Sequence, residues 1–265
     1  MANFEELNSF EYMGRGLMLF RDHEGGYGAV YILSGRSDSS QAREVEEDPN
    51  SRVISTKPTN PEVLAEGNSN LLLYPAFIPI CNGLYGIIVG NGVQTESVIS
   101  EWKYYPNPSV KSITRLSDAF KKPNLRFDQS SGTFINIHEH EPDKPNYTPR
   151  ITGLITKDDA AICNMYIDEK GIDGKLISVL NLENGEIGFI STYSGENINP
   201  LPSFTGGPIM MVLPESYKNI QTIVEAVFHA VPGDDKKGQD DFRVAVAGVM
   251  YKNDVLTSYI INNKS

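Results

Sequence analysis

The sequence has little cysteine, no long apolar run and no excess of positive charge. Two cysteines in 265 residues are too few to staple a small secreted scaffold, and no basic start followed by an apolar run opens the chain. We therefore expect reduced thiols in a cytoplasmic protein. The most apolar stretch, residues 71–89, is interrupted by prolines and by an Asn-Gly pair, which argues against a membrane span. The formal net charge of −11 makes nucleic acid and anionic lipid unfavourable partners.

Familiar cofactor and metal signatures are also missing. The glycines at positions 25, 26 and 28 lie between two apolar runs and indicate a hairpin turn rather than a dinucleotide fingerprint or a phosphate-binding loop. Residues 138–141 read His-Glu-His-Glu, but on a strand His138 and His140 would share one face and both glutamates the other. Two histidines make an incomplete metal site. We expect no metal and no cofactor, and interpret this segment as a solvated or substrate-facing strand end.

The residues that are present favour a sheet-rich α+β protein. Hydrophobic residues make up 40% of the chain, enough for a sizeable core, and valine, isoleucine, tyrosine and phenylalanine favour strands. The pattern predicts strands over residues 12–20, 29–33, 71–80, 84–89, 134–140, 151–155, 160–167, 176–182, 187–193, 242–251 and 255–261. It predicts helices over 95–104, 112–122 and 217–231, and polar loops over 34–50 and 194–208. We find no repeat or linker, and expect a single domain over 1–265 with two packed sheets and outer helices.

Four arginines stand where predicted strands meet loops, namely Arg15, Arg36, Arg43 and Arg150. Such junctions are the usual place for a binding site on a rigid scaffold. The guanidinium fork suits phosphate better than the ammonium group of lysine does. Taken singly, each is more simply an ordinary surface or structural arginine. Taken together, they suggest a local cationic site for a small anion on an acidic protein.

Short motifs around these arginines follow one another along the chain. They are Gly14-Arg15-Gly16, Gly35-Arg36-Ser37 with a following Arg43, Asn-Gly-Val-Gln-Thr-Glu at 91–96, Asn-Tyr-Thr-Pro-Arg-Ile at 146–151 and Ile-Ser-Thr-Tyr at 190–193. In this order the series resembles the archaeal-type IMP cyclohydrolase family, and residues 201–208 resemble its bacterial branch. The resemblance covers most of the chain. It implies a four-layer αββα sandwich like that of Ntn-hydrolases, although the opening Met-Ala offers no N-terminal nucleophile.

The resemblance also implies roles for particular residues. Arg43 matches a substrate-linked arginine and is a candidate catalytic residue. An acidic residue before the Thr-Pro-Arg motif is implicated too, and both Glu141 and Asp143 fit it. A family tyrosine falls within residues 74–77, where Tyr74 keeps its hydroxyl and Phe77 lacks one, so the identity of the functional tyrosine stays open. The implied substrate-binding residues are Arg15, Arg36, Ser37, Asn91, Gln94, Thr95 and Arg150. The loop at 91–95 is equally well explained as the N-terminus of a helix.

The implied activity is that of an IMP cyclohydrolase, a hydrolase of cyclic amidines that works in the ring-closing direction at the last step of de novo purine biosynthesis. It converts formyl-AICAR to IMP with loss of water. The reaction is intramolecular and needs no nucleophilic side chain, in keeping with the lack of a Ser-His-Asp or Cys-His pattern. The expected partner is a purine nucleotide, and we expect a homo-oligomer. The alternatives are a catalytically degenerate purine-nucleotide-binding protein, which Phe77 keeps open, and a hydrolase or transferase acting on a related purine intermediate.

Overall fold

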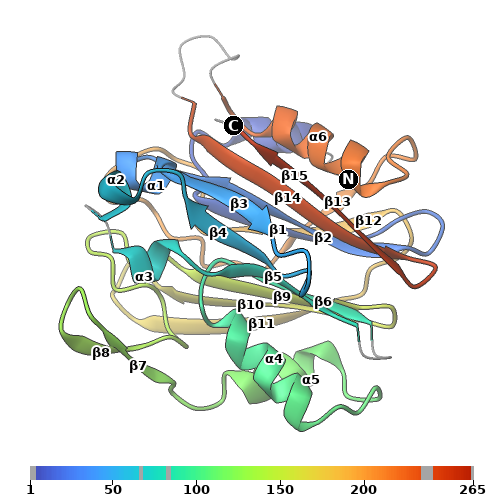
Figure 1. The fold of residues 1–265 in the computed structure, drawn as a ribbon, viewed down its shortest axis with the longest axis horizontal. Coiled ribbons are helices and arrows are strands. Elements are labelled where there is room, and N and C mark those ends of the chain that lie inside the picture. Colours follow the sequence, from blue (N-terminus) through green and yellow to red (C-terminus); the bar gives the residue numbers. More distant parts are fainter. Residues whose placement is uncertain (1–3, 66–67, 82–84, 234–240, 264–265) are drawn as a thin grey trace.

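The computed structural model describes residues 4–65, 68–81, 85–233 and 241–263. It has mixed α+β structure built on two large antiparallel sheets that pack face to face, with helices on the outer side of each sheet (Figure 1). The expected α+β class is confirmed. In the described part of the chain, no helix is long and apolar enough to cross a membrane.

One sheet has six strands, all antiparallel to their neighbours. Their order is β13 (Ile209–Val212), β12 (Glu186–Ser191), β1 (Arg15–Arg21), β2 (Tyr27–Ser34), β14 (Arg243–Lys252) and β15 (Val255–Asn262). Helix α6 (Ile220–Ala230) and the short 3-10 helix η1 (Phe4–Ser9) cover its outer face.

The other sheet has seven strands, again antiparallel throughout. Their order is β11 (Asp173–Leu180), β10 (Ala160–Ile167), β9 (Arg150–Thr156), β6 (Gly86–Gly90), β5 (Pro75–Ile80), β4 (Ile54–Pro58) and β3 (Arg43–Glu47). Helices α4 (Thr95–Tyr104) and α5 (Ser112–Ala119) cover its outer face. The short helices α1 (Asp38–Gln41), α2 (Pro61–Ala65) and α3 (Ser69–Leu72), and a separate hairpin of β7 (Leu125–Asp128) and β8 (Thr133–Asn136), lie at one side (Figure 1).

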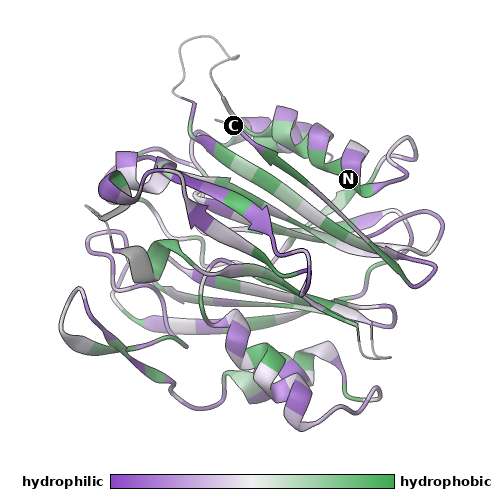
Figure 2. Cartoon of the chain, in the orientation of Figure 1, coloured by the Kyte–Doolittle hydropathy of each residue, from purple (hydrophilic) through white to green (hydrophobic). Residues whose placement is uncertain are grey.

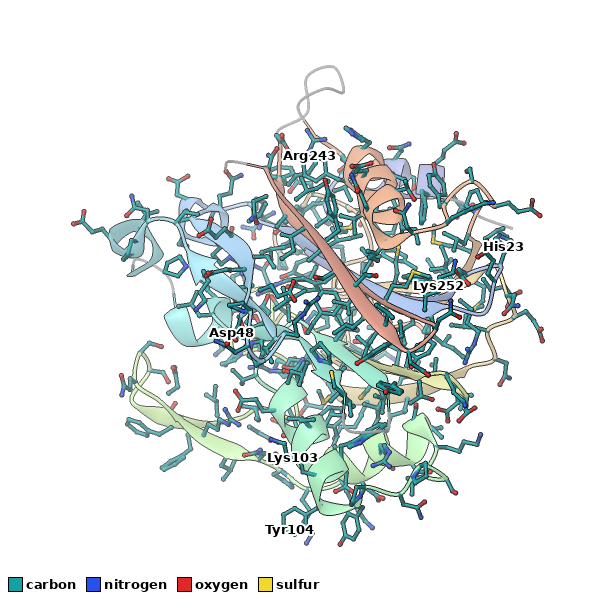
Figure 3. All side chains as sticks on the ribbon, turned by 45° about the vertical axis from the view of Figure 1, so that its right-hand side comes forward. His23, Asp48, Lys103, Tyr104, Arg243 and Lys252 are labelled. Carbon is teal, nitrogen blue, oxygen red and sulfur yellow. The ribbon has the colours of Figure 1, made fainter. Side chains whose placement is uncertain are left out.

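The central strands are apolar on both faces because each sheet is covered on both sides. In β1, Leu17 and Leu19 pack in the core between the sheets, while Met18 and Phe20 pack against α6 and η1. This is the alternation that a strand imposes on successive side chains. Hydrophobic residues accordingly run along the strands, and α6 alternates hydrophobic and hydrophilic bands (Figure 2). Side chains fill the space between the sheets, whereas Lys103 and Tyr104 extend away from them at the end of α4 (Figure 3).

Strongly periodic segments are predicted well. The helix over 95–104 and the strand over 160–167 coincide with α4 and β10, and the other predicted helices are shortened to α5 and α6. The hairpin is confirmed in the pairing of β5 with β6, but residues 71–72 of the predicted first strand belong to α3 and that strand begins at Pro75. Its Asn82-Gly83 turn lies outside the described residues.

Three expectations are corrected. The polar loop over 34–50 contains α1 and the edge strand β3, whose mixed polar sequence carries little apolar alternation. The strand over 134–140 ends at Asn136, and the histidines that follow it do not lie on a strand. Strands β4, β7 and β13 were not expected, because each has only four or five residues with few apolar positions or follows a glycine-rich loop.

Candidate anion-binding pocket

A pocket of about 250 Å³ opens where the ends of β1 and β2 meet β3 and the loops over 137–149 and 192–208. Its charged lining consists of Arg15, Arg36, Arg43, Glu141 and Asp143. These residues are up to 128 positions apart, Arg15 to Asp143, and three of them are arginines on a protein whose net charge is −11. Like charges are gathered in this way at a cost, which an anionic ligand would offset.

The backbone around Gly14 fixes the position of Arg15. Gly14 has a φ of +70°, and a Cβ there would overlap Thr192 Oγ1 and come within 2.6 Å of the Tyr193 ring. Only glycine allows this close approach. As a result, the Arg15 backbone N–H donates to Thr192 Oγ1 at 3.1 Å, and Tyr193 is placed beside Arg15 at the pocket wall.

Arg36 and Arg43 flank the short helix α1. Arg36 Nη1 donates to the Ile198 carbonyl at 2.9 Å, and its guanidinium lies 5.9 Å from the centre of the Tyr12 ring. Arg43 is only 3% exposed, and its Nε donates to the Ser40 carbonyl at 2.8 Å. No carboxylate of the described residues lies within ion-pair distance of either guanidinium, so both arginines keep charge available to a ligand.

Ser37 lines the same pocket, yet its hydroxyl has a local role. It caps α1 by accepting from the Ser40 backbone N–H at 3.2 Å, and the Ser40 hydroxyl lies 3.0 Å from the Ser37 backbone N–H in return. This capping box holds the turn between Arg36 and Arg43 in a fixed shape.

Glu141 is the most deeply buried acid in the pocket, with 1% of its surface exposed. One carboxylate oxygen lies 3.4 Å from Arg15 Nη2 and the other 3.8 Å from Arg150 Nη1. Burial raises the pKa of the Glu141 carboxyl, and the charges of Arg15 and Arg150 oppose that rise. A carboxylate in this position can accept a proton from a bound ligand.

Asp143 belongs to a chain of hydrogen bonds. Its carboxylate accepts from the Thr148 backbone N–H at 2.7 Å and from the Thr148 hydroxyl at 2.5 Å. The Thr148 and Tyr193 hydroxyl oxygens are also 2.5 Å apart. Burial raises the pKa of the Tyr193 phenol, so this phenol stays protonated at neutral pH. Because the Thr148 hydroxyl donates to Asp143, the Tyr193 hydroxyl donates to Thr148, and its oxygen can accept from a ligand. Thr148 and Tyr193 are pocket residues that the sequence does not single out, although both stand in the motifs that carry the family resemblance.

Arg150 and Tyr74 lie behind the pocket rather than in its lining. Arg150 is the first residue of β9 and reaches the pocket only through Glu141. The Tyr74 hydroxyl lies 2.6 Å from that of Tyr31, and both tyrosines are buried. The ring of Tyr31 packs edge-on against Phe77. The structure therefore brings together Arg15, Arg36, Ser37, Arg43, Glu141 and Asp143, but not Arg150 or Tyr74.

Asn91, Gln94 and Thr95 are fully buried and hold the backbone around β9 and α4. Asn91 Nδ2 donates to the Pro149 carbonyl at 2.8 Å, and its Oδ1 accepts from the Ile151 N–H at 2.8 Å. Gln94 Nε2 lies 3.3 Å from the Ile151 carbonyl, and Thr95 Oγ1 donates to the Pro75 carbonyl at 3.1 Å. None of the three lines the pocket. Their polar groups are used to position the Thr-Pro-Arg segment.

The histidines of residues 138–141 are held by other groups. The ring nitrogens of His138 lie 2.8 Å from Ser97 Oγ and 2.7 Å from the Lys122 carbonyl. His140 Nδ1 lies 3.1 Å from an Asp173 oxygen. In the described ranges, no group of three metal-ligating side chains comes together.

Comparisons with known proteins add no relative to this picture. A scan against protein-family models finds no match, and a search of curated proteins finds none either. The pocket is lined by three arginines and two acids, a set of side chains that suits a small anion.

Proposed function

We propose that the protein is an IMP cyclohydrolase, which closes the second ring of formyl-AICAR to give IMP. The observation that carries the proposal is the convergence of Arg15, Arg36 and Arg43 with the buried Glu141 in one pocket. The order of motifs along the chain supplies the reaction type. The order of layers, helix, sheet, sheet, helix, is the one that this family's sandwich implies, and an Ntn-like fold belongs to the proposal. A cytoplasmic location and a homo-oligomeric state also belong to the proposal.

The residues would divide the chemistry as follows. Arg36 and Arg43, which have no carboxylate partner among the described residues, bind the nucleotide phosphate. The carboxamide nitrogen attacks the formyl carbon, and Glu141 takes a proton from that nitrogen. Arg15 stabilises the negative charge that develops on the former formyl oxygen. This oxygen takes up a proton from solvent to become a hydroxyl, and Glu141 then returns its proton to the hydroxyl, which leaves as water. The N–H proton of the former formamide is lost to solvent as the ring C=N bond forms. Thr148 and Asp143 hold the Tyr193 hydroxyl at the wall beside Arg15.

The test is direct. Purified protein mixed with formyl-AICAR should form IMP, followed by its absorbance, at a rate proportional to protein concentration. Arg43→Ala should lose binding and turnover together, because a phosphate contact acts in both the ground state and the transition state. An absence of IMP formation with tight binding of the nucleotide would overturn the proposed activity.

A second candidate is a purine-nucleotide-binding protein that has lost catalysis. It is favoured by Phe77, which lacks a hydroxyl. It is also favoured by Tyr74, whose hydroxyl is hydrogen-bonded to that of Tyr31 and does not line the pocket. This candidate predicts that IMP binds the arginine pocket while formyl-AICAR is left unchanged.

A further inference from the structure

A second cavity, of about 230 Å³, lies between the β7–β8 hairpin and the loop that leads into α4. Its apolar walls are Leu73, Val93, Phe127, Ile135 and Ile137. Arg150 forms another part of the lining and belongs to this cavity rather than to the arginine pocket. The cavity therefore combines an apolar body with one deeply buried cation.

Arg150 is under-bonded for a guanidinium with 1% exposure. Its Nη1 makes only long contacts, 3.4 Å to Gln94 Oε1 and 3.8 Å to Glu141 Oε1. Within the described ranges, no acceptor reaches Nε or Nη2. Leaving a buried charged donor without an acceptor carries the full desolvation penalty of that group. Both atoms have almost no accessible surface, so an acceptor in the cavity would recover that free energy by turning the guanidinium toward it.

Nε and Nη2 form the side edge of the guanidinium, whose two N–H groups are parallel and match the two oxygens of a carboxylate. Arg243 uses this edge in the same protein. Its Nε and Nη2 donate to the two oxygens of Asp241 at 2.9 and 3.0 Å. Arg243 lies at the start of β14 (Figure 3), in the six-stranded sheet, whereas Arg150 begins β9 of the seven-stranded sheet. The unbonded edge of Arg150 thus favours a carboxylate over a single acceptor.

The other charges around the cavity are already engaged. Arg126 Nη2 pairs with Glu96 at 2.9 Å. Asp128 Oδ2 accepts from the Ser130 hydroxyl at 2.7 Å and the Ser131 N–H at 3.1 Å, so this acid is used in the β7–β8 turn. Neither acid competes with a ligand for the side edge of Arg150.

We propose that this cavity is a second binding site, which takes a small monocarboxylate with an aromatic or branched apolar body. The guanidinium of Arg150 turns its side edge toward the cavity as the ligand binds, so that the carboxylate accepts from Nε and Nη2. The apolar body packs against Phe127, Ile135 and Ile137. This site is separate from the arginine pocket and does not depend on the proposed ring-closing activity.

The probe is para-fluorobenzoate, titrated into the full chain and followed by fluorine NMR. We expect saturable binding, and binding about tenfold weaker for the amide para-fluorobenzamide, which cannot accept at both oxygens. Ile135→Trp should fill the cavity and abolish binding. Arg150→Met should also abolish binding, because it removes the guanidinium. If Arg150→Met fails to fold, Ile135→Trp still tests the proposal.

Matched controls come from the same hairpin and from the other pocket. Phe127 and Phe134 form one ring pair, with centroids 5.5 Å apart, but only Phe127 lines the cavity. Phe127→Ala should weaken binding several-fold, while Phe134→Ala and Arg43→Ala should leave it unchanged. Absence of saturable binding, equal effects of the two phenylalanine variants, equal affinity for the amide, or loss of binding in Arg43→Ala would each overturn the proposal.

Discussion

The two acids of the arginine pocket differ in what their carboxylates contact. Glu141 lies between the guanidinium groups of Arg15 and Arg150, whereas both oxygens of Asp143 accept hydrogen bonds from Thr148. An acid whose oxygens are already committed to protein donors is poorly placed to take a proton from a ligand. This difference favours Glu141 over Asp143 as the proton acceptor of the proposed reaction, a choice that the sequence left open.

Glu141→Gln should therefore lower kcat by about 10²- to 10⁴-fold with little change in KM, because general base help is lost only in the transition state. Asp143→Asn should have a smaller effect on kcat, since it disturbs Tyr193 only through Thr148. Steady-state kinetics of IMP formation measures both variants. If Asp143→Asn showed the larger loss in kcat, the assignment would be reversed.

In the proposed mechanism, the pH profile of activity depends on the same carboxylate. Burial raises the pKa of Glu141 above its ordinary value of 4.5, and a base works only when deprotonated, so activity should fall as the pH drops through this raised pKa. Arg15→Gln removes a cation that lowers that pKa, and should move the acidic limb of kcat/KM to higher pH. Arg36→Gln is the control, because Arg36 donates a hydrogen bond to the Ile198 carbonyl. This variant should raise KM without moving the acidic limb of kcat/KM. An equal shift in both variants would show that the limb belongs to another group.

Among the elements, α6 lies close against its sheet at a glycine of β14. A Cβ on Gly248, in the middle of β14, would lie 2.6 Å from side-chain carbons of Ile220 and Val224 on α6. Gly248→Ala should therefore push the helix outward and destabilise the protein by about 1–3 kcal/mol. Gly86→Ala at the start of β6 is the matched control, because its nearest neighbours would stand at an ordinary 3.4 Å. Urea unfolding measures both, and equal stability of the two variants would contradict this account of the helix contact.

The elements differ in how well the sequence predicts them, and burial explains the difference. β10 and α4 have long apolar patterns because each packs on a core, so their bounds are predicted. β3 is an edge strand whose sequence is Arg-Glu-Val-Glu-Glu, with one fully apolar position to indicate it. β7 and β8 form a hairpin outside the two large sheets, and Phe127 and Phe134 remain exposed there. Where tertiary pairing rather than local pattern decides the structure, sequence reasoning cannot find the strand.

At the scale of the whole molecule, the sequence predicted part of the site. The arginines at strand ends indicated an anion site, and Arg15, Arg36 and Arg43 do line one pocket. Arg150 was expected with them, but as the first residue of β9 it is buried and faces a different cavity. The sequence predicts ligand-binding roles for Asn91 and Gln94, whose amides are buried in the structure. A polar residue in a motif gives the same sequence pattern whether it binds substrate or holds the backbone. Only the packing of the two sheets distinguishes these cases.

The whole protein should need no added cofactor for ring closure. The attacking nitrogen and the formyl carbon belong to one molecule, so holding the two arms together can supply much of the rate enhancement. Arginines can stabilise the developing charge without a metal ion. Protein dialysed against a chelator should thus convert formyl-AICAR to IMP at an unchanged rate, with no folate or nicotinamide present. The control is the dialysed protein with zinc or magnesium added back, which should be no faster. If chelation stopped the reaction and zinc restored it, the electrostatic role given to Arg15 would pass to a metal ion, and a site that includes His138 or His140 would have to replace the one proposed.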